Sequence, residues 1–242
     1  MYVLAIETAT PVASVALASR SAVLAERMVL NQRTHSVNLL PMIRDVLEEC
    51  GLGGKELSGV AVSSGPGSFT GLRIGMSAAK ALAQVWGLPC AAVPTLEAMV
   101  QPLAGTGALA CPLLNARKGE VYAALYNCQS PRAVCLWGPA AASPQVLAEE
   151  LLALARPVLL LGEGALVYAG VFKELMGETA CFAPASASFP RGGAVAELGV
   201  AILEGGKGTS PHDLRPEYVR LPEAEVLWRK KQKNREKEIT ER

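Results

Sequence analysis

A glycine-rich turn is the part of this sequence best suited to hold a phosphate group. Four glycines lie between Gly65 and Gly75, after an apolar strand-like segment and at the start of a helix-like one. Glycine lets a phosphate or a neighbouring backbone come close to the main chain. A P-loop is excluded because Leu72 and Arg73 follow Gly71, and a dinucleotide fingerprint is excluded because Gly71 comes one residue too late. Two interpretations remain: a phosphate-facing loop, and a tight turn against a neighbouring segment.

Residues for nucleophilic or metal chemistry are sparse. Ser63, Ser64 and Ser68 lie close to the turn, but the G-x-S-x-G frame of a nucleophile elbow is missing. The two histidines, His35 and His212, are far apart in sequence, and we expect a capping or surface role for each. Six cysteines without a C-x-x-C pair suit buried thiols in a reducing compartment. The sequence therefore predicts no catalytic residue, no metal site and no hydrolase activity.

The charges are distributed unevenly along the chain. Seven Lys or Arg lie between Trp228 and Arg242, so the preceding residues carry 16 basic and 19 acidic side chains. Such a body is a poor surface for holding a nucleic-acid backbone unaided. The basic tail is either an arm that touches RNA or a solvated terminal helix. No apolar run approaches the roughly 18 residues of a membrane span, so we expect a soluble, cytoplasmic protein with no membrane partner.

The hydrophobic pattern predicts an α/β protein in which one arrangement occurs twice. Three strands, a helix, a strand and a helix are expected at residues 3–8, 12–19, 22–30, 37–50, 59–63 and 71–86. The same order is expected at 111–116, 120–127, 133–138, 143–155, 158–164 and 194–204. These two βββαβα halves give expected units at 1–104 and 105–222, followed by a basic tail at 223–242.

The helix expected at 71–86 carries more apolar surface than a surface helix needs. At about 100° per residue, its polar side chains gather within roughly 60°, and its small and apolar side chains span about 220°. A stripe of about 100° is enough to cover a core. One interpretation places this helix between the sheet and another helix of its own domain. The other makes Gly71, Gly75, Ala78 and Leu82 a groove for a partner helix.

Six segments, in this order and spacing, resemble the TsaB family, also called YeaZ, a relative of the larger subunit TsaD. They are LAIETAT at 4–10, THSVNLLPMI at 34–43, GPGSFTGLRIGMSAAKALA at 65–83, NARKGEVYAALY at 115–126, GEGA at 162–165 and RPEYVR at 215–220. The third segment is long and specific, and the resemblance extends from Met1 to about Leu221. Asn115 stands where an aspartate is expected, and the tail after Leu227 also departs from the family pattern.

The resemblance implies the duplicated fold of actin, the heat-shock chaperone ATPase domains and the sugar kinases (ASKHA). It implies a non-catalytic scaffold subunit, without a cofactor, that pairs with a TsaD-like catalytic subunit or forms a homodimer. With a TsaE-like ATPase, the complex would transfer a threonylcarbamoyl group to N6 of adenosine 37, and tRNA would be reached only through the complex. The H-x-x-x-H metal motif of TsaD is missing from this sequence. The implied partner interface comprises Leu39, Ile43, Gly71, Leu72, Gly75, Ala78, Ala79 and Leu82.

An active ATP-dependent kinase or ATPase of the same fold is the alternative function. Its candidate cofactor-binding residues are Glu7, Thr8, Thr10, Lys118, Gly162 and Gly164. The first four would lie in the cleft, and the turn with the two glycines would face an adenine. That turn is otherwise a simple connection from a strand to a helix. A stand-alone RNA-binding module that uses the basic tail is a third interpretation.

Overall fold

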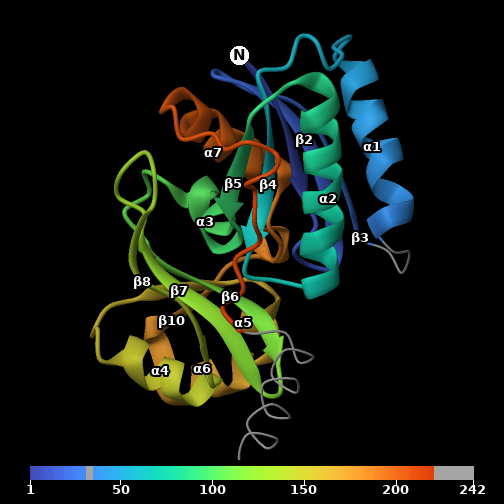
Figure 1. Ribbon diagram of the computed structural model, residues 1–242. Coiled ribbons are helices and arrows are strands. Elements are labelled where there is room, and N and C mark those ends of the chain that lie inside the picture. The colour runs from blue at the N-terminus through green and yellow to red at the C-terminus, as the bar shows by residue number, and fades with distance from the viewer. Residues whose placement is uncertain (31–34, 221–242) are drawn as a thin grey trace, which may run out of the picture.

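The computed structural model describes residues 1–30 and 35–220, which form two five-stranded sheets, one above the other in Figure 1. The first sheet contains β3 (Val23–Leu30), β2 (Val12–Ser19), β1 (Tyr2–Glu7), β4 (Gly59–Gly65) and β5 (Cys90–Pro94), in that order. The second contains β10 (Ala180–Phe182), β9 (Val158–Leu161), β6 (Leu109–Arg117), β7 (Glu120–Asn127) and β8 (Val134–Ala142). The α-helices are α1 (His35–Glu49), α2 (Phe69–Trp86), α3 (Thr95–Val100), α4 (Pro144–Leu152), α5 (Glu163–Val167), α6 (Ala169–Met176) and α7 (Gly192–Glu204). Short 3₁₀ turns lie at Gln101–Leu103, Gly177–Thr179 and Ala185–Ala187.

The two sheets have the same topology. In the first, β1 pairs with β2 and β2 with β3 in antiparallel fashion, whereas β1 pairs with β4 and β4 with β5 in parallel. In the second, the antiparallel pairs are β6–β7 and β7–β8, and the parallel pairs are β6–β9 and β9–β10. The duplicated α/β fold that the sequence predicts is therefore confirmed.

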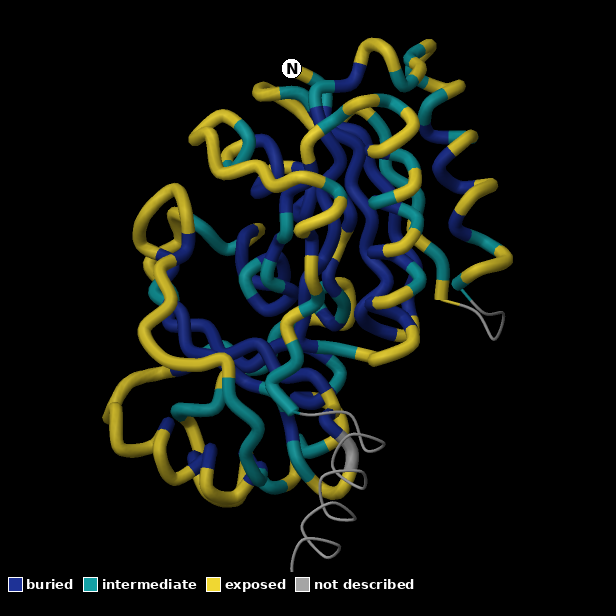
Figure 2. The backbone as a smooth tube through the Cα atoms, in the orientation of Figure 1, coloured by how far each residue is buried: buried dark blue, intermediate teal, exposed yellow. Residues whose placement is uncertain are grey.

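Strands β1, β2 and β4 of the first sheet are buried on both faces and form the dark centre of the upper half in Figure 2, whereas the edge strand β3 is largely exposed. Leu4 and Ile6 of β1 face the core under α1 and α2. Val3 and Ala5 face the opposite core under α7. Because alternate residues of a strand point to opposite faces, both sets must be apolar, which explains the continuous apolar run of β1.

Helix α7 forms close to the expected residues but packs in an unexpected place. Ala194, Val195 and Leu198 are buried against the first sheet, together with Ala5 and Ala61. The assignment of this helix to the second half is therefore wrong. The strands on either side of residue 104 do separate into two sheets, but the chain returns to the first sheet after it completes the second. In the second half α5 and α6, which the pattern does not reveal, follow β9.

The second sheet packs against helices on one face and against the first half on the other. Phe172 and Met176 of α6 belong to the first of these cores, and Leu96 and Met99 of α3 belong to the second. The sequence pattern also misses α3 and β5, which are only six and five residues long. In residues 1–30 and 35–220, no helix combines the length and the apolar character that crossing a bilayer requires.

Candidate functional site

Glu7, the acidic residue among the candidate cofactor-binding residues, is buried at the end of β1. Its Oε1 accepts a hydrogen bond from the Ala9 amide at 2.5 Å, and its Oε2 accepts one from the Ser63 hydroxyl at the end of β4. Burial raises the pKa of Glu7 to about 7, because desolvation of the charged form outweighs these two hydrogen bonds. Both carboxylate oxygens are thus engaged by donors of the chain itself.

Thr8 and Thr10 are also buried, and they hold the loop after β1 in place. The Thr8 hydroxyl donates to the Gly71 carbonyl at 2.8 Å. The Thr10 hydroxyl accepts from the Val12 amide at 3.3 Å, and the Thr10 carbonyl lies 2.9 Å from Nε2 of His35. Glu7, Thr8 and Thr10 therefore form one closed polar loop.

The glycine-rich turn packs against this loop. A Cβ on Gly71 would overlap the Thr8 carbonyl oxygen, and a Cβ on Gly75 would overlap the Thr8 hydroxyl. The Ser68 amide donates to the Ala9 carbonyl at 2.7 Å, and the Ser68 hydroxyl caps α2 by accepting from the Gly71 amide. Glycine is therefore needed at these positions because Thr8 of the chain itself lies against them. This supports the tight-turn interpretation.

The candidates from the second half lie in two turns. Lys118 is exposed in the turn between β6 and β7, with a φ of 54°. Gly162 has a φ of 98°, and a Cβ there would overlap the Leu113 carbonyl; Gly164 also lies against Leu113. The glycines thus form a connection from β9 to α5 that packs closely on β6. Burial raises the pKa of the intervening Glu163, which accepts a hydrogen bond from the backbone of Asn115.

Most of the expected partner-interface residues lie inside the chain's own core. Figure 1 shows α1 and α2 on one outer side of the first half. Six of the eight expected residues are buried, and only Ala78 and Leu82 are half-buried. The stripe that the sequence assigns to a partner is the stripe that covers the first sheet, so the structure corrects these six: Leu39, Ile43, Gly71, Leu72, Gly75 and Ala79.

Other apolar side chains of the two helices are exposed instead. Val37 and Leu40 of α1 are 54% and 59% exposed, and Phe69 and Val85 of α2 are 39% and 80% exposed. The 220° apolar arc of α2 was a usable signal for Val85, because it exceeds what the sheet can cover. We call the surface formed by Val37, Leu40, Ile74, Ala78, Leu82 and Val85 the α1–α2 face.

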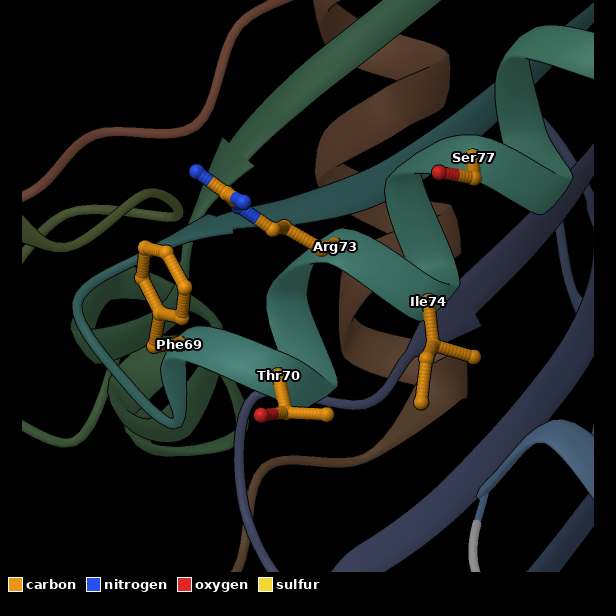
Figure 3. A pocket seen from close by; sticks show the side chains of 5 residues that line it. All are labelled: Phe69, Thr70, Arg73, Ile74 and Ser77. Atoms are coloured by element: carbon orange, nitrogen blue, oxygen red, sulfur yellow. The ribbon is translucent and has the colours of Figure 1, made fainter.

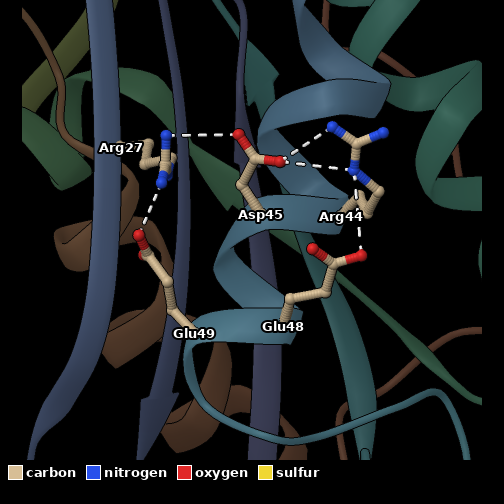
Figure 4. A network of polar contacts seen from close by, with 5 residues as sticks. All are labelled: Arg27, Arg44, Asp45, Glu48 and Glu49. Carbon is tan, nitrogen blue, oxygen red and sulfur yellow. Dashed lines mark hydrogen bonds and ion pairs between the residues drawn. The ribbon is translucent and has the colours of Figure 1, made fainter.

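Charged residues of α1 and β3 form an ion-pair network at the side of α1 (Figure 4). Arg27 contacts Asp45 at 3.2 Å and Glu49 at 2.5 Å. Arg44 contacts Asp45 at 3.1 Å and Glu48 at 3.8 Å. Exposed pairs of this kind contribute little to stability. The network ties α1 to the edge strand of the first sheet.

The first turns of α2 line a shallow depression of about 530 Å³ on the surface. Figure 3 shows that Phe69 and Arg73 project from the same side of the helix, with the guanidinium beside the ring, whereas Ile74 points away from them. The Arg73 guanidinium carbon lies 3.9 Å from the centre of the Phe69 ring. In the sequence Arg73 belongs to the polar stripe of this helix, and its spacing does not reveal the contact with Phe69.

Within residues 1–30 and 35–220, neither histidine belongs to a group of potential metal ligands. His35 bonds the loop after β1, and His212 is exposed. In the part of the chain that the structure describes, no three His, Cys, Asp or Glu side chains are grouped so that they could hold a metal ion.

Two halves that share one strand order define a protein of the class of actin, the chaperone ATPase domains and the sugar kinases. Within that class, the chain belongs to the TsaB (YeaZ) family. It is 31% identical over 237 residues to the Bacillus subtilis "tRNA threonylcarbamoyladenosine biosynthesis protein TsaB", covering 96% of this chain and 100% of the relative. It is 41% identical over 131 residues to the Escherichia coli protein of the same name, covering 52% and 55%.

Two further comparisons agree with this family. The family model "TsaD: tRNA N6-adenosine threonylcarbamoyltransferase" matches residues 27–228. The solved structure of YeaZ from Pseudomonas aeruginosa superimposes with a TM-score of 0.77 and 26% identity, covering 90% of this chain and 99% of that one. The resemblance stated from the six sequence segments is therefore confirmed.

Proposed function

We propose that this chain is a non-catalytic subunit of the assembly that makes N6-threonylcarbamoyladenosine at position 37 of tRNA. Its relatives in Bacillus subtilis and Escherichia coli carry the name of that pathway, which supports this assignment. The chain pairs with a TsaD-like catalytic subunit through the α1–α2 face, and a TsaE-like ATPase joins the pair. Without the partner, the same face holds two copies of the chain together as a homodimer.

The observation that carries the proposal is a contrast between two regions. The polar loop after β1 is closed by hydrogen bonds within the chain, whereas the α1–α2 face is apolar and exposed. An ATP-dependent kinase or ATPase needs a carboxylate in the cleft for metal and phosphate, but both oxygens of Glu7 bond within the chain. The α1–α2 face exposes Leu40 and Val85, whose contact with water a partner would remove. Association is therefore the activity that these surfaces support best.

In the complex, this chain would act on the catalytic subunit and not directly on tRNA. A scaffold raises the activity of a catalytic subunit only by binding its active conformation better than its inactive one. Its slightly acidic body is poorly suited to hold tRNA alone, so tRNA contact occurs through the complex. The localisation that follows for such a pathway is the cytoplasm.

Copurification with the TsaD-like subunit from the same cell tests the proposal. We expect Leu40→Arg and Val85→Arg each to abolish copurification, because a long charged side chain would have to be buried at the contact. The matched control is Val167→Arg in α5, which replaces another exposed valine, 61% exposed, in the second half. If both α1–α2 variants copurify as well as the control does, the proposed surface is wrong.

A further inference from the structure

A segment near the end of the described chain packs across the first half. We call residues 209–220 the strap; Figure 1 shows it in red, running from the region of α7 toward the second sheet. At its start, Thr209 and Cys90 exchange two backbone hydrogen bonds of 2.8 Å at the edge of the first sheet. Leu214 is buried in the core under α1 and α2. The Glu217 amide donates to the Ser64 carbonyl at 2.7 Å.

The end of the strap is fixed on both sides of Tyr218. Gly65 has a φ of +124°, and a Cβ there would overlap the Glu217 carbonyl, so the glycine-rich turn accommodates the strap. Two residues after Tyr218, Arg220 forms an ion pair with Glu120 of β7. Tyr218 is thereby held between the first half and the second half.

Tyr218 in turn holds Arg73. Nε of Arg73 donates a hydrogen bond of 3.0 Å to the Tyr218 hydroxyl. The guanidinium lies over the Phe69 ring, and the Phe69 and Tyr218 ring centres are 5.3 Å apart. One nitrogen and one face of the guanidinium are thus restrained, although the side chain lies at the surface.

The two terminal nitrogens of Arg73 remain directed outward beside Phe69 (Figure 3). Among the residues that the structure describes, none places a carboxylate against either nitrogen. Other arginines differ: Arg132 pairs with Glu97, and Arg191 pairs with Glu26. The planar edge with two parallel donors is the geometry that binds a carboxylate through both oxygens.

We propose that Arg73 recognises an Asp or Glu carboxylate of the TsaD-like partner, and that Tyr218 of the strap is its positioning residue. This inference rests on the proposed function, since it adds Arg73 of α2 as a polar contact with the same partner. Phe69, which lies in the same depression and under the guanidinium, supplies apolar contact beside the ion pair. A single carboxylate matches the single charge of Arg73. A nucleic-acid phosphate is disfavoured, because the phosphates next to it would add negative charge close to Glu217 of the strap and to a slightly acidic protein body.

The test compares partner affinity among variants of the full chain, with the purified TsaD-like subunit as the probe. Arg73→Ala should weaken binding about thirtyfold or more, as truncation of one member of an interfacial charge pair does. Arg73→Lys keeps the charge but loses the planar two-donor edge, so it should weaken binding less than Arg73→Ala. Arg156→Ala, which removes an exposed arginine of the second half, is the matched control and should bind like the wild type.

The positioning role has a separate readout. Tyr218→Phe keeps the ring on Phe69 but removes the acceptor for Nε, so it should weaken binding several-fold. In the Arg73→Ala background, the same substitution should have no further effect. The loss in Arg73→Ala should also shrink between about 0.05 M and about 0.5 M salt, because salt screens the ion pair.

The outcomes separate this inference from the proposed function. If the wild-type chain does not bind the TsaD-like subunit, the proposed function and this inference are both overturned. If the wild type binds and Arg73→Ala binds equally well, only this inference is overturned. If Arg73→Ala instead lowers tRNA binding by the assembled complex and leaves the protein–protein affinity unchanged, Arg73 recognises a phosphate and the carboxylate is excluded. Unchanged thermal unfolding of Arg73→Lys and Tyr218→Phe shows that folding does not account for the losses.

Discussion

The loop after β1 and the α1–α2 face belong to the same half of the protein but place polar and apolar groups in opposite ways. In the loop, Glu7 and Thr8 are buried, and their oxygens bond to the chain itself. On the face, Leu40 and Val85 are exposed although they are apolar. Burying a polar group destabilises a protein unless the group forms hydrogen bonds. Covering exposed apolar surface with a partner, in contrast, lowers the free energy. One region is therefore complete within the chain, and the other is the region through which we propose that a partner binds.

The largest loss of stability should come from a substitution that forces the glycine-rich turn away from the loop after β1. Gly71→Ala places a methyl group where the Thr8 carbonyl lies, and neither backbone can move freely, so we expect a loss of about 3 kcal/mol or more in the free energy of unfolding. Urea unfolding measures it. Gly170→Ala in α6 has no atom within 4 Å of the new methyl group and is the control, expected to keep or raise stability. Equal stability of both variants would mean that the loop and the turn are not packed as described.

The next largest effect is the dependence of the free energy of unfolding on pH. The pKa of Glu7 rises from 4.5 to about 7 on folding, so the folded state retains a proton that the unfolded state has lost. Stability should therefore fall as pH rises from 4.5 to about 7 and then level off, by about 3 kcal/mol in total.

Glu7→Gln isolates this contribution because the amide does not titrate. The measurement is the difference between the unfolding free energies of wild type and Glu7→Gln across that pH range. A difference that stays constant with pH would show that the Glu7 carboxyl is not desolvated, and the loop would then be open to solvent.

The smallest effect on stability should come from the exposed face. Val85→Ser removes apolar surface that is already in water, so we expect the free energy of unfolding to change by no more than about 0.5 kcal/mol. The same variant should nevertheless weaken association, measured by the concentration at which the homodimer or the TsaD-like pair dissociates. A large loss of stability in the monomer would instead place Val85 in the chain's own packing and remove the contrast between the two regions.

Much of the fold could be predicted from local pattern, because each element has its own period. The three opening strands, α1, β4 and α2 lie within a few residues of their expected positions, and the second half repeats the strand order. The short β5 and α3 were missed because five or six residues carry too little periodicity. Helix α7 lies close to its expected position, but its local sequence pattern does not indicate which sheet it covers.

The site was predicted less well than the fold. The sequence singled out the glycine-rich turn and the excess apolar surface of α2, but most of the residues that it assigns to a partner contact are buried in the chain's own core. Small residues at regular spacing suit packing against a partner helix and against the chain's own loop equally well. Burial against Thr8 decided between the two, and no local pattern records it.

The sequence by itself determined the family, the repeated order of elements and the need for a close neighbour at the glycine-rich turn. These properties depend on residues adjacent in the chain, whose spacing sets backbone geometry and amphipathic period. Only the tertiary structure decided that Ser63 closes off Glu7, that α7 returns to the first sheet and that Tyr218 holds Arg73 from 145 positions away. Contacts between segments so far apart are selected by the packing of the whole chain, so they leave no periodic mark in the sequence.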